Sequence, residues 1–441
     1  MTGKKQSLAL PADRSLSAWE VVMPLRMNRR QFVSSLSATA AAAALSSPAI
    51  AQAGTVKIAQ LEILSGGFAV LGETNARSIE VGIEEFNARA GQGPKLEVQL
   101  FDSKGSAQEA QTIFAQVADQ GVRYVTGGGT SAVVGSLIDA IARHNERNPG
   151  KEILYLNHQA IDPDFTNARC NFWHFRFDPH VFMRMDAMTR FLAADRSVQN
   201  VFLINQDYAF GQQVQNSAKE QLAAKRPDVK IVGEELHPIG RVRDFSPFVA
   251  KIRASGADTI ITGNFGSDLV LLIRAANDAG LNVKFYTYYA NALGAPTALG
   301  EAGIGRTRLV TGMDLNALNP RMTAIHKRFK EKYPKLELFH AAYFDMLDMM
   351  GAAFRKAGSA EPLQVARAME GMTIDGAFGP VTMRADDHQM LAPLFVQTFD
   401  KVDGVSVKVG VDGLNLGFRT DAKYMSADTT LPHSCIMRRP S

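Results

Sequence analysis

Short apolar runs alternate with longer amphipathic stretches along the chain from Val56 onward. The short runs are rich in β-branched and aliphatic residues, a composition that is typical of buried strands. The first set of predicted strands covers residues 56–61, 96–101, 122–126 and 153–156. Between them, apolar residues such as Ile79, Ile83 and Phe86 recur at helical spacing. Strands that each lead into a helix predict an α/β fold with a doubly wound parallel sheet and right-handed crossovers.

The same pattern starts again after the aromatic segment 172–177, which indicates a second lobe. Its predicted strands cover residues 201–204, 229–232, 259–262 and 284–288. Later segments predict a strand near 309–310, helices over 321–332, 341–357 and 363–369, and strands over 378–383 and 394–399. We expect lobe I to comprise residues 54–176 plus 291–390, lobe II residues 177–290 plus 391–415, and the C-terminal tail residues 416–441. Periodicity is low beyond Asp412, so the tail is predicted to be loop.

A glycine-rich turn, residues 127–131, joins the third predicted strand to a helix that begins near Ala132. Thr130 or Ser131 is expected to cap this helix, because hydroxyl side chains satisfy free N–H groups at helix starts. Backbone N–H groups, hydroxyls and the positive end of a helix dipole together suit a carboxylate. The same residues also fit a plain strand-to-helix turn, and both interpretations remain open. Ser65 and Gln159 follow other predicted strands, so they are expected in the same crevice.

Residues 1–53 have the features of an export signal. Arg29-Arg30 precede an Ala/Ser/Leu-rich run over 33–47, which ends in the small-residue pattern Ala49-Ile50-Ala51. The paired arginines and the weakly hydrophobic core resemble the bacterial twin-arginine signal more than the general secretory one. We expect cleavage after Ala51 or Ala53 and a periplasmic protein, with Met27 as a candidate true start. No cysteine stands at the cleavage point, so a lipid anchor is not expected.

The charge balance and the two cysteines add two points. The predicted signal contains six Lys or Arg and two Asp or Glu, which accounts for the whole formal charge of +4. The net charge of the mature chain is therefore about zero, and it gives no reason to expect nucleic-acid binding.

Cys170 and Cys435 can form a disulfide in an oxidising compartment, or remain as two unpaired buried thiols. A disulfide would attach the C-terminal tail to the middle of the chain.

The sequence contains no motif for catalysis or metal binding. The histidines lack a metal-ligand spacing, and neither a Gly-x-Ser-x-Gly elbow nor a nucleophilic cysteine pattern occurs. The match of Gly127-x-Gly129-x-x-Ala132 to a dinucleotide fingerprint is weak, because the loop follows the third strand rather than the first. We expect no enzyme activity, no cofactor and no metal.

Aromatic residues gather where strands of the second lobe are predicted to end. They are Tyr208, Phe210, Phe265, Tyr286, Tyr288 and Tyr289. Aromatic faces can close over an apolar ligand while hydroxyls hold its polar end. Each ring taken singly also fits a hydrophobic core, and only the repeated placement at strand ends favours a pocket.

Several short motifs resemble those of the periplasmic solute-binding proteins of branched-chain amino-acid ABC transporters. They are residues 64–67 with 71–72, 83–87, Asp102, 124–131, 175–176, 207–211, 244–246, 342–345 and 378–380. The likeness extends from about Val56 to about Phe399. It implies two α/β lobes joined by three crossing strands, which close on a small ligand and deliver it to a membrane permease, with a monomer as the family expectation.

The resemblance also implies positions for the ligand contacts. Ser131 matches the serine that holds the ligand carboxylate, and two further contacts fall on Gln159 and Ile161. Phe210 stands where the family has a tyrosine, and Tyr289 stands where the family has the acid that receives the ligand ammonium. The predicted ligand-binding residues are Leu71, Thr130, Ser131, Gln159, Ala160, Ile161, Phe210, Phe265, Tyr288 and Tyr289.

Among the departures from the family pattern, the uncharged Tyr289 changes the expected chemistry of the ligand most. An unpaired ammonium in a closed site costs several kcal/mol, so a tyrosine there favours a carboxylate without an amine, for example an aromatic acid. Asp268 or Glu62 could still supply the charge, which keeps amino acids open as ligands. A ligand-sensing receptor component of the same fold and an exported enzyme are the alternative functions.

Overall fold

The computed structural model describes residues 54–89, 91 and 93–440. The predicted export signal, residues 1–53, lies outside the described residues. Every helix in the described part of the chain is too short or too polar to cross a membrane.

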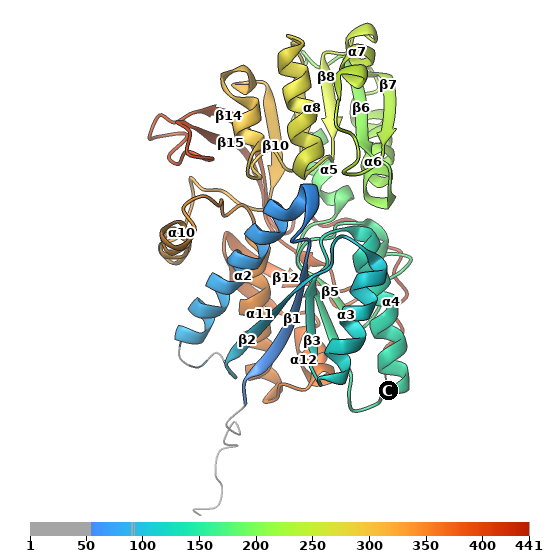
Figure 1. Ribbon diagram of the computed structural model, residues 1–441, viewed down its shortest axis with the longest axis vertical. Helices are drawn as coiled ribbons and strands as arrows, with labels where there is room; N and C mark the ends of the chain where they lie inside the picture. Colours follow the sequence, from blue (N-terminus) through green and yellow to red (C-terminus); the bar gives the residue numbers. More distant parts are fainter. Residues whose placement is uncertain (1–53, 90, 92, 441) are drawn as a thin grey trace, which may run out of the picture. The chain divides into compact units, whose positions relative to one another are not determined.

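A five-stranded parallel sheet, in the order β2-β1-β3-β4-β5, forms the first half of the fold (Figure 1). Its strands are β1 (Val56–Glu62), β2 (Leu96–Asp102), β3 (Tyr124–Gly127), β4 (Leu154–Asn157) and β5 (His174–Arg176). Its helices are η1 (Gly66–Phe68), α2 (Ala69–Ala88), α3 (Ala107–Asp119), α4 (Ser131–Arg147), η2 (Pro163–Thr166), α10 (Pro320–Lys332), α11 (Ala342–Ala357) and α12 (Pro362–Met369). Helices α3 and α4 pack against each other, and α2 packs against α10 and α11. Every residue of β3 and β4 is buried, as expected for central parallel strands that are covered on both faces.

A seven-stranded sheet, in the order β15-β14-β10-β9-β8-β6-β7, forms the second half. Its strands are β6 (Asn200–Gln206), β7 (Lys230–His237), β8 (Thr259–Thr262), β9 (Lys284–Thr287), β10 (Thr307–Thr311), β14 (Leu394–Lys401) and β15 (Leu416–Tyr424). Its helices are α5 (Val181–Leu192), α6 (Ala209–Lys225), α7 (Ser246–Ala254), α8 (Gly266–Asp278), α9 (Ala295–Leu299) and η3 (Glu301–Gly303). Strands β6 to β10 run parallel, whereas β14 and β15 are antiparallel to their neighbours.

The second sheet is buried on both faces. Val201 and Leu203 of β6 belong to one hydrophobic cluster, and Phe202 and Ile204 belong to another. Successive side chains of a strand point to opposite faces, so the two clusters lie on the two sides of the sheet. This burial explains why β6 reads as one continuous apolar run in the sequence.

Up to β15, the described chain passes between the two halves three times: after β5, after β10 and before β14. A small sheet of β11 (Thr373–Gly376), β12 (Gly379–Met383) and β13 (Met390–Leu391) precedes the third passage. Strand β10 belongs to the seven-stranded sheet, although its residues fall within the segment expected in lobe I. The residue boundaries of the two lobes stay a prediction.

The prediction of loop beyond Asp412 was wrong. Residues 416–424 form β15, which pairs with the whole length of β14. Only its first three residues are buried, and the polar residues that follow are partly or fully exposed. An edge strand of this kind has no continuous apolar run, which is why the sequence pattern missed it.

Candidate functional site

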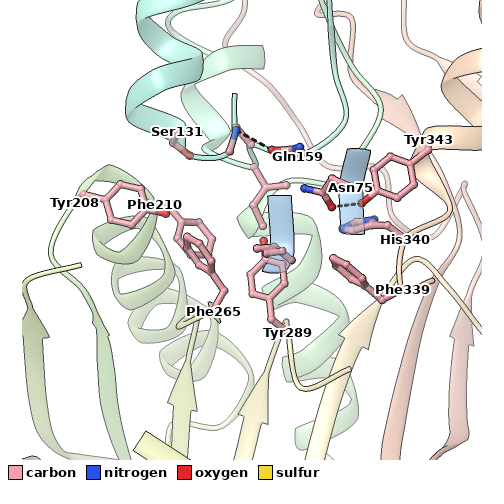
Figure 2. A pocket seen from close by; sticks show the side chains of 14 residues that line it. Asn75, Ser131, Gln159, Tyr208, Phe210, Phe265, Tyr289, Phe339, His340 and Tyr343 are labelled. Atoms are coloured by element: carbon pink, nitrogen blue, oxygen red, sulfur yellow. Dashed lines mark hydrogen bonds between the residues drawn. The ribbon is translucent and has the colours of Figure 1, made fainter. Parts of the chain in front are cut away.

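A cavity that is partly open to solvent is lined by residues from both halves of the fold (Figure 2). The lining residues are Leu71, Asn75, Gly129, Ser131, Gln159, Ala160, Ile161, Tyr208, Phe210, Phe265, Tyr289, Phe339, His340 and Tyr343. Small-molecule sites are typically concave and lie where two parts of a fold meet. The cavity is therefore the candidate binding site.

The glycine turn places Ser131 at the start of α4. Gly127 has φ of 89°, and a Cβ there would lie 2.1 Å from the carbonyl oxygen of Leu61 in β1. Only glycine fits so close to a neighbouring strand in this conformation. The turn therefore brings the N-terminus of α4 directly to the edge of the sheet.

Thr130 and Ser131 have different roles at this helix start. Thr130 is the N-cap, and its hydroxyl accepts a hydrogen bond from the Val133 N–H at 3.4 Å. Ser131 is the first helical residue and lines the cavity, and neither its hydroxyl nor its N–H has a partner in the described part of the chain. A free hydroxyl and a free N–H at a helix N-terminus suit an anion.

An aromatic wall made of Tyr208, Phe210, Phe265 and Tyr289 covers another side of the cavity. The ring centroids of Phe265 and Tyr289 are 5.6 Å apart, and those of Phe210 and Phe265 are 6.2 Å apart. These residues follow the ends of β6, β8 and β9, where parallel sheets bind ligands. The wall is apolar apart from the tyrosine hydroxyls.

A polar wall faces the cavity from the first half. It consists of Asn75 from α2, Tyr343 from α11 and His340 from the segment just before α11. Tyr343 donates its hydroxyl hydrogen to Oδ1 of Asn75. Sequence reasoning missed all three residues. Asn75 lies one helical turn after Leu71, and Tyr343 belongs to the motif 342–345, so both carried a weak signal, whereas His340 carried none.

No Asp, Glu, Lys or Arg is among the described residues that line the cavity. Asp268, a candidate partner for a ligand ammonium, is buried and accepts hydrogen bonds from Gln206 Nε2 and the Gly240 N–H instead. Glu62, the other candidate, is also buried. It accepts a hydrogen bond from Asn75 at 3.2 Å, and Nε2 of Gln159 lies 2.5 and 2.6 Å from its two oxygens. Neither carboxylate lines the cavity, and both hold protein amides, although Oδ1 of Asp268 has no hydrogen-bond partner among the described residues.

His340 is neutral at physiological pH. Burial lowers the pKa of its imidazole to about 4, even though nearby Asp178 acts in the opposite direction and Arg184 and His158 add to the lowering. The side chain of His340 is 9% exposed. The polar wall therefore presents hydrogen-bonding groups without a formal charge.

Eight of the ten predicted ligand-binding residues line the cavity, and two do not. The hydroxyl of Thr130 is used as the helix cap. Tyr288 is buried below the aromatic wall, and its hydroxyl donates to the Val181 carbonyl at 3.5 Å. Tyr289 therefore lines the cavity, whereas Tyr288 does not. Ligand contact by the other eight residues stays a prediction.

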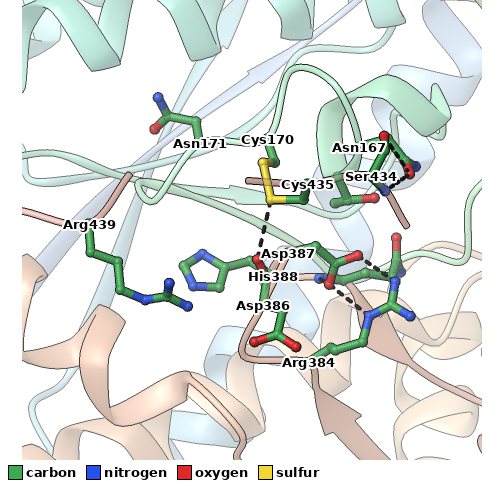
Figure 3. Close-up of a disulfide and its surroundings, with 12 residues drawn as sticks. Asn167, Cys170, Asn171, Arg384, Asp386, Asp387, His388, Ser434, Cys435 and Arg439 are labelled. Atoms are coloured by element: carbon green, nitrogen blue, oxygen red, sulfur yellow. Dashed lines mark hydrogen bonds and ion pairs between the residues drawn. A yellow bond between two sulfur atoms is a disulfide. The ribbon is translucent and has the colours of Figure 1, made fainter. Parts of the chain in front are cut away.

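A disulfide joins Cys170 to Cys435 (Figure 3). Cys170 lies between β4 and β5 of the first half, while the tail that carries Cys435 follows β15 of the second half. Beside the disulfide, the Ser434 N–H donates to Oδ1 of Asn167 at 2.9 Å. The disulfide thus links the two halves covalently, in addition to the passages of the chain between them.

Among the described residues, no cluster of three or more metal-ligating side chains occurs.

Two α/β halves that line one cavity between them form an arrangement that can close around a ligand. The model of the family described as "Periplasmic binding protein" matches residues 55–404, and this chain belongs to that family. The family is one of solute-binding proteins and not of enzymes. The predicted fold class and family resemblance are confirmed.

Three relatives illustrate the similarity. Leu/Ile/Val-binding protein homolog 4 of Brucella abortus is 32% identical over 417 residues, which cover 91% of this chain and 97% of that protein. A solved structure of the leucine-, isoleucine-, valine-, threonine- and alanine-binding protein of Brucella ovis, in a closed conformation, has a TM-score of 0.78 and 30% identity and covers 88% of this chain and 100% of that one. A solute-binding protein of Rhodopseudomonas palustris in complex with 3,4-dihydroxybenzoic acid has a TM-score of 0.73 at 17% identity, covers 84% of this chain and 98% of that one, and shows the fold alone.

Proposed function

We propose that this protein captures a small organic carboxylate without an ammonium group, aromatic acids being the best fit, and delivers it to an ABC permease in the inner membrane. The observation that carries this proposal is the composition of the cavity lining. Ser131 offers a free hydroxyl and N–H at a helix start, the aromatic wall offers ring faces, and no acidic side chain lines the cavity. These groups suit a carboxylate and an apolar body, and they leave a ligand ammonium without a counter-ion.

The named relatives supply the competing ligand. The Brucella ovis protein carries a name that specifies five amino acids, and it is 30% identical to this chain. An amino-acid ligand here would need a carboxylate to pair with its ammonium. Glu62 and Asp268 hold protein amides, and Tyr289 occupies the position at which the family resemblance places the acid. The lining therefore favours the amine-free acid over the amino acid.

Ligand binding would be coupled to closure of the two halves. Ser131 and the polar wall belong to the first half, and the aromatic wall belongs to the second. A ligand that touches both sides binds the closed arrangement more tightly than an open one, so it shifts the population toward closure. The permease would then recognise the closed, loaded protein in the periplasm.

Mass spectrometry of small molecules released by denaturing the purified mature protein tests this proposal. Thermal-shift titration with each released compound then shows whether it stabilises the fold. We expect an amine-free carboxylic acid that raises the melting temperature in a dose-dependent way. Release of an amino acid that stabilises the protein more strongly than its amine-free counterpart would contradict the proposal.

A further inference from the structure

Asp178 is a buried carboxylate with one oxygen that lacks a hydrogen-bond partner. Its Oδ1 accepts from Nη2 of Arg184 at 2.5 Å, and both side chains are 1% exposed. Its Oδ2 is buried and has no hydrogen-bond partner among the described residues. The polar atom that approaches this oxygen is Nε2 of His340, at 3.5 Å. An unsatisfied carboxylate oxygen in the interior is costly, so it has a strong preference for a donor at this position.

Arg184 makes no hydrogen bond to the second oxygen, and its Nε, Nη1 and Nη2 each donate to another acceptor. Its Nε donates to the carbonyl oxygen of Pro179 at 3.1 Å, and its Nη1 donates to that of Val310 at 3.3 Å. An N–H at Nε2 of His340 would supply the donor that Oδ2 lacks. A small tightening of the 3.5 Å separation would turn this approach into a hydrogen bond.

The protonation state of His340 then follows from Asp178. A neutral imidazole carries one N–H and one lone pair, and the hydrogen bond made by one nitrogen decides the state of the other. With its hydrogen on Nε2 facing Asp178, His340 must present the lone pair of Nδ1. His340 lines the cavity and its Nδ1 has no hydrogen-bond partner among the described residues, so this lone pair is available to a ligand that reaches it.

We propose that His340 is a specificity residue that accepts a hydrogen bond from a hydroxyl or N–H group on the bound acid, and that Asp178 is the positioning residue that holds His340 in this state. This inference rests on the proposed function and adds a second feature to the ligand. Figure 2 shows His340 on the opposite side of the cavity from Ser131. The ligand would thus carry a carboxylate at one end and a hydrogen-bond donor, such as a hydroxyl, at the other.

The two residues beside His340 do not offer a comparable acceptor at this position. Tyr343, whose ring lies 5.7 Å from that of His340, gives its hydroxyl hydrogen to Oδ1 of Asn75. Phe339, on the other side, is apolar and lines the cavity. A carboxylic acid that lacks a second polar group would leave the imidazole lone pair without a partner, at a cost in affinity.

Nitrogen-15 NMR of histidine-labelled, ligand-free protein at pH 7.5 tests the position of the hydrogen directly. We expect the His340 ring to show a protonated Nε2 and an unprotonated Nδ1, with His340→Phe used to assign the signal. In Asp178→Asn, the amide can keep its oxygen on Arg184 and turn its N–H₂ toward His340, which should move the imidazole hydrogen to Nδ1. A wild-type hydrogen on Nδ1, or on both nitrogens, would overturn the inference whether or not any acid binds.

Calorimetric titration with 3- and 4-hydroxybenzoate and with 3- and 4-fluorobenzoate tests the specificity. Fluorine is close to a hydroxyl in size but donates no hydrogen bond. We expect the wild-type protein to prefer at least one hydroxy acid over its fluoro partner by about ten-fold or more, and His340→Phe to bring the ratio near one. The control His326→Gln changes a partly buried histidine of α10 that does not line the cavity, and it should keep the wild-type ratio.

The outcomes separate the inference from the proposed function. Similar affinities for the hydroxy and fluoro acids, or a preference that survives in His340→Phe, would overturn the inference while leaving acid capture intact. Failure of all four acids to bind would count against aromatic acids as ligands, and the NMR measurement would still decide the role of Asp178. Because the readout of the titrations is a ratio of affinities, a general loss of stability in His340→Phe does not mimic the expected result.

Discussion

The guanidinium carbon of Arg184 lies 5.9 Å from the ring centroid of Tyr289, the aromatic residue that stands where the family resemblance places an acid. Arg184 is completely buried and pairs with Asp178, so this cation is already neutralised within the protein. Tyr289 thus separates the cavity from a buried ion pair. The wall that would face a ligand ammonium offers an uncharged phenol.

Introducing an acid at this position should change ligand preference. Tyr289→Glu is expected to weaken binding of an amine-free acid such as 3-phenylpropanoate by about ten-fold or more, because two like charges would share a closed site. Tyr289→Gln is the matched control, since glutamine has nearly the same shape without the charge. Calorimetric titration of both variants measures the effect. Equal affinities of the two variants for the acid would contradict this account of the wall.

Ser131 should contribute directly to carboxylate binding. Its hydroxyl is free of protein partners in the described part of the chain, so Ser131→Ala removes one charge-assisted hydrogen bond and leaves the helix cap at Thr130 intact. We expect the affinity for the bound acid to fall about ten-fold or more. Ser136→Ala, on the same helix, is the control, because its hydroxyl bonds to the Val133 carbonyl and does not line the cavity. An unchanged affinity in Ser131→Ala would place the carboxylate elsewhere.

The fold and the site differ in how far the sequence predicts them. Strands such as β3 and β6 are recognisable because burial on both faces makes them continuous apolar runs, whereas the half-exposed edge strand β15 has no such run. Ser131 and Phe265 were found because both follow a strand at the edge where parallel sheets bind ligands. His340 lies in a segment before a helix and reaches the cavity only through tertiary packing, which no local pattern encodes.

The disulfide between Cys170 and Cys435 should stabilise the protein. It closes a loop with a sequence separation of 265 residues and ties the tail after β15 to the first half. Replacing both cysteines by serine should lower the free energy of unfolding by about 2–4 kcal/mol. Urea denaturation compares the double variant with the wild type, and a thiol assay on the denatured wild type shows that no thiol is free. A double variant as stable as the wild type would show that the tail contributes no constraint.

The buried imidazole of His340 should make stability depend on pH. Its pKa is lowered from 6.5 to about 4 in the folded state, so as pH falls below 6.5 the unfolded chain takes up a proton that the folded chain does not. The contribution of His340 to stability is therefore complete above pH 6.5 and is lost as pH falls toward 4. Groups that face His340, namely Asp178, Arg184 and His158, are unchanged in the variant proposed for comparison.

Unfolding measured at pH 7.5 and pH 4.5 in wild type and His340→Gln isolates this effect. The wild type should lose about 2 kcal/mol more than the variant between the two pH values. Burial also lowers the pKa of His174 and His180, but these histidines titrate alike in both proteins and cancel in the comparison. Parallel losses in the two proteins would show that His340 titrates normally in the folded state.

The central claim, that the cavity takes a carboxylate without an ammonium group, is tested most directly with ligand pairs that differ only in that group. The pairs are leucine with 4-methylpentanoate and phenylalanine with 3-phenylpropanoate, each titrated calorimetrically into the purified mature protein at pH 7.5. We expect the amine-free member of at least one pair to bind about 30-fold or more tightly than its amino acid, since the lining offers no counter-ion for the ammonium. Tighter binding of leucine or phenylalanine than of the corresponding acid would contradict the claim and would mean that a carboxylate such as Glu62 turns toward the ligand.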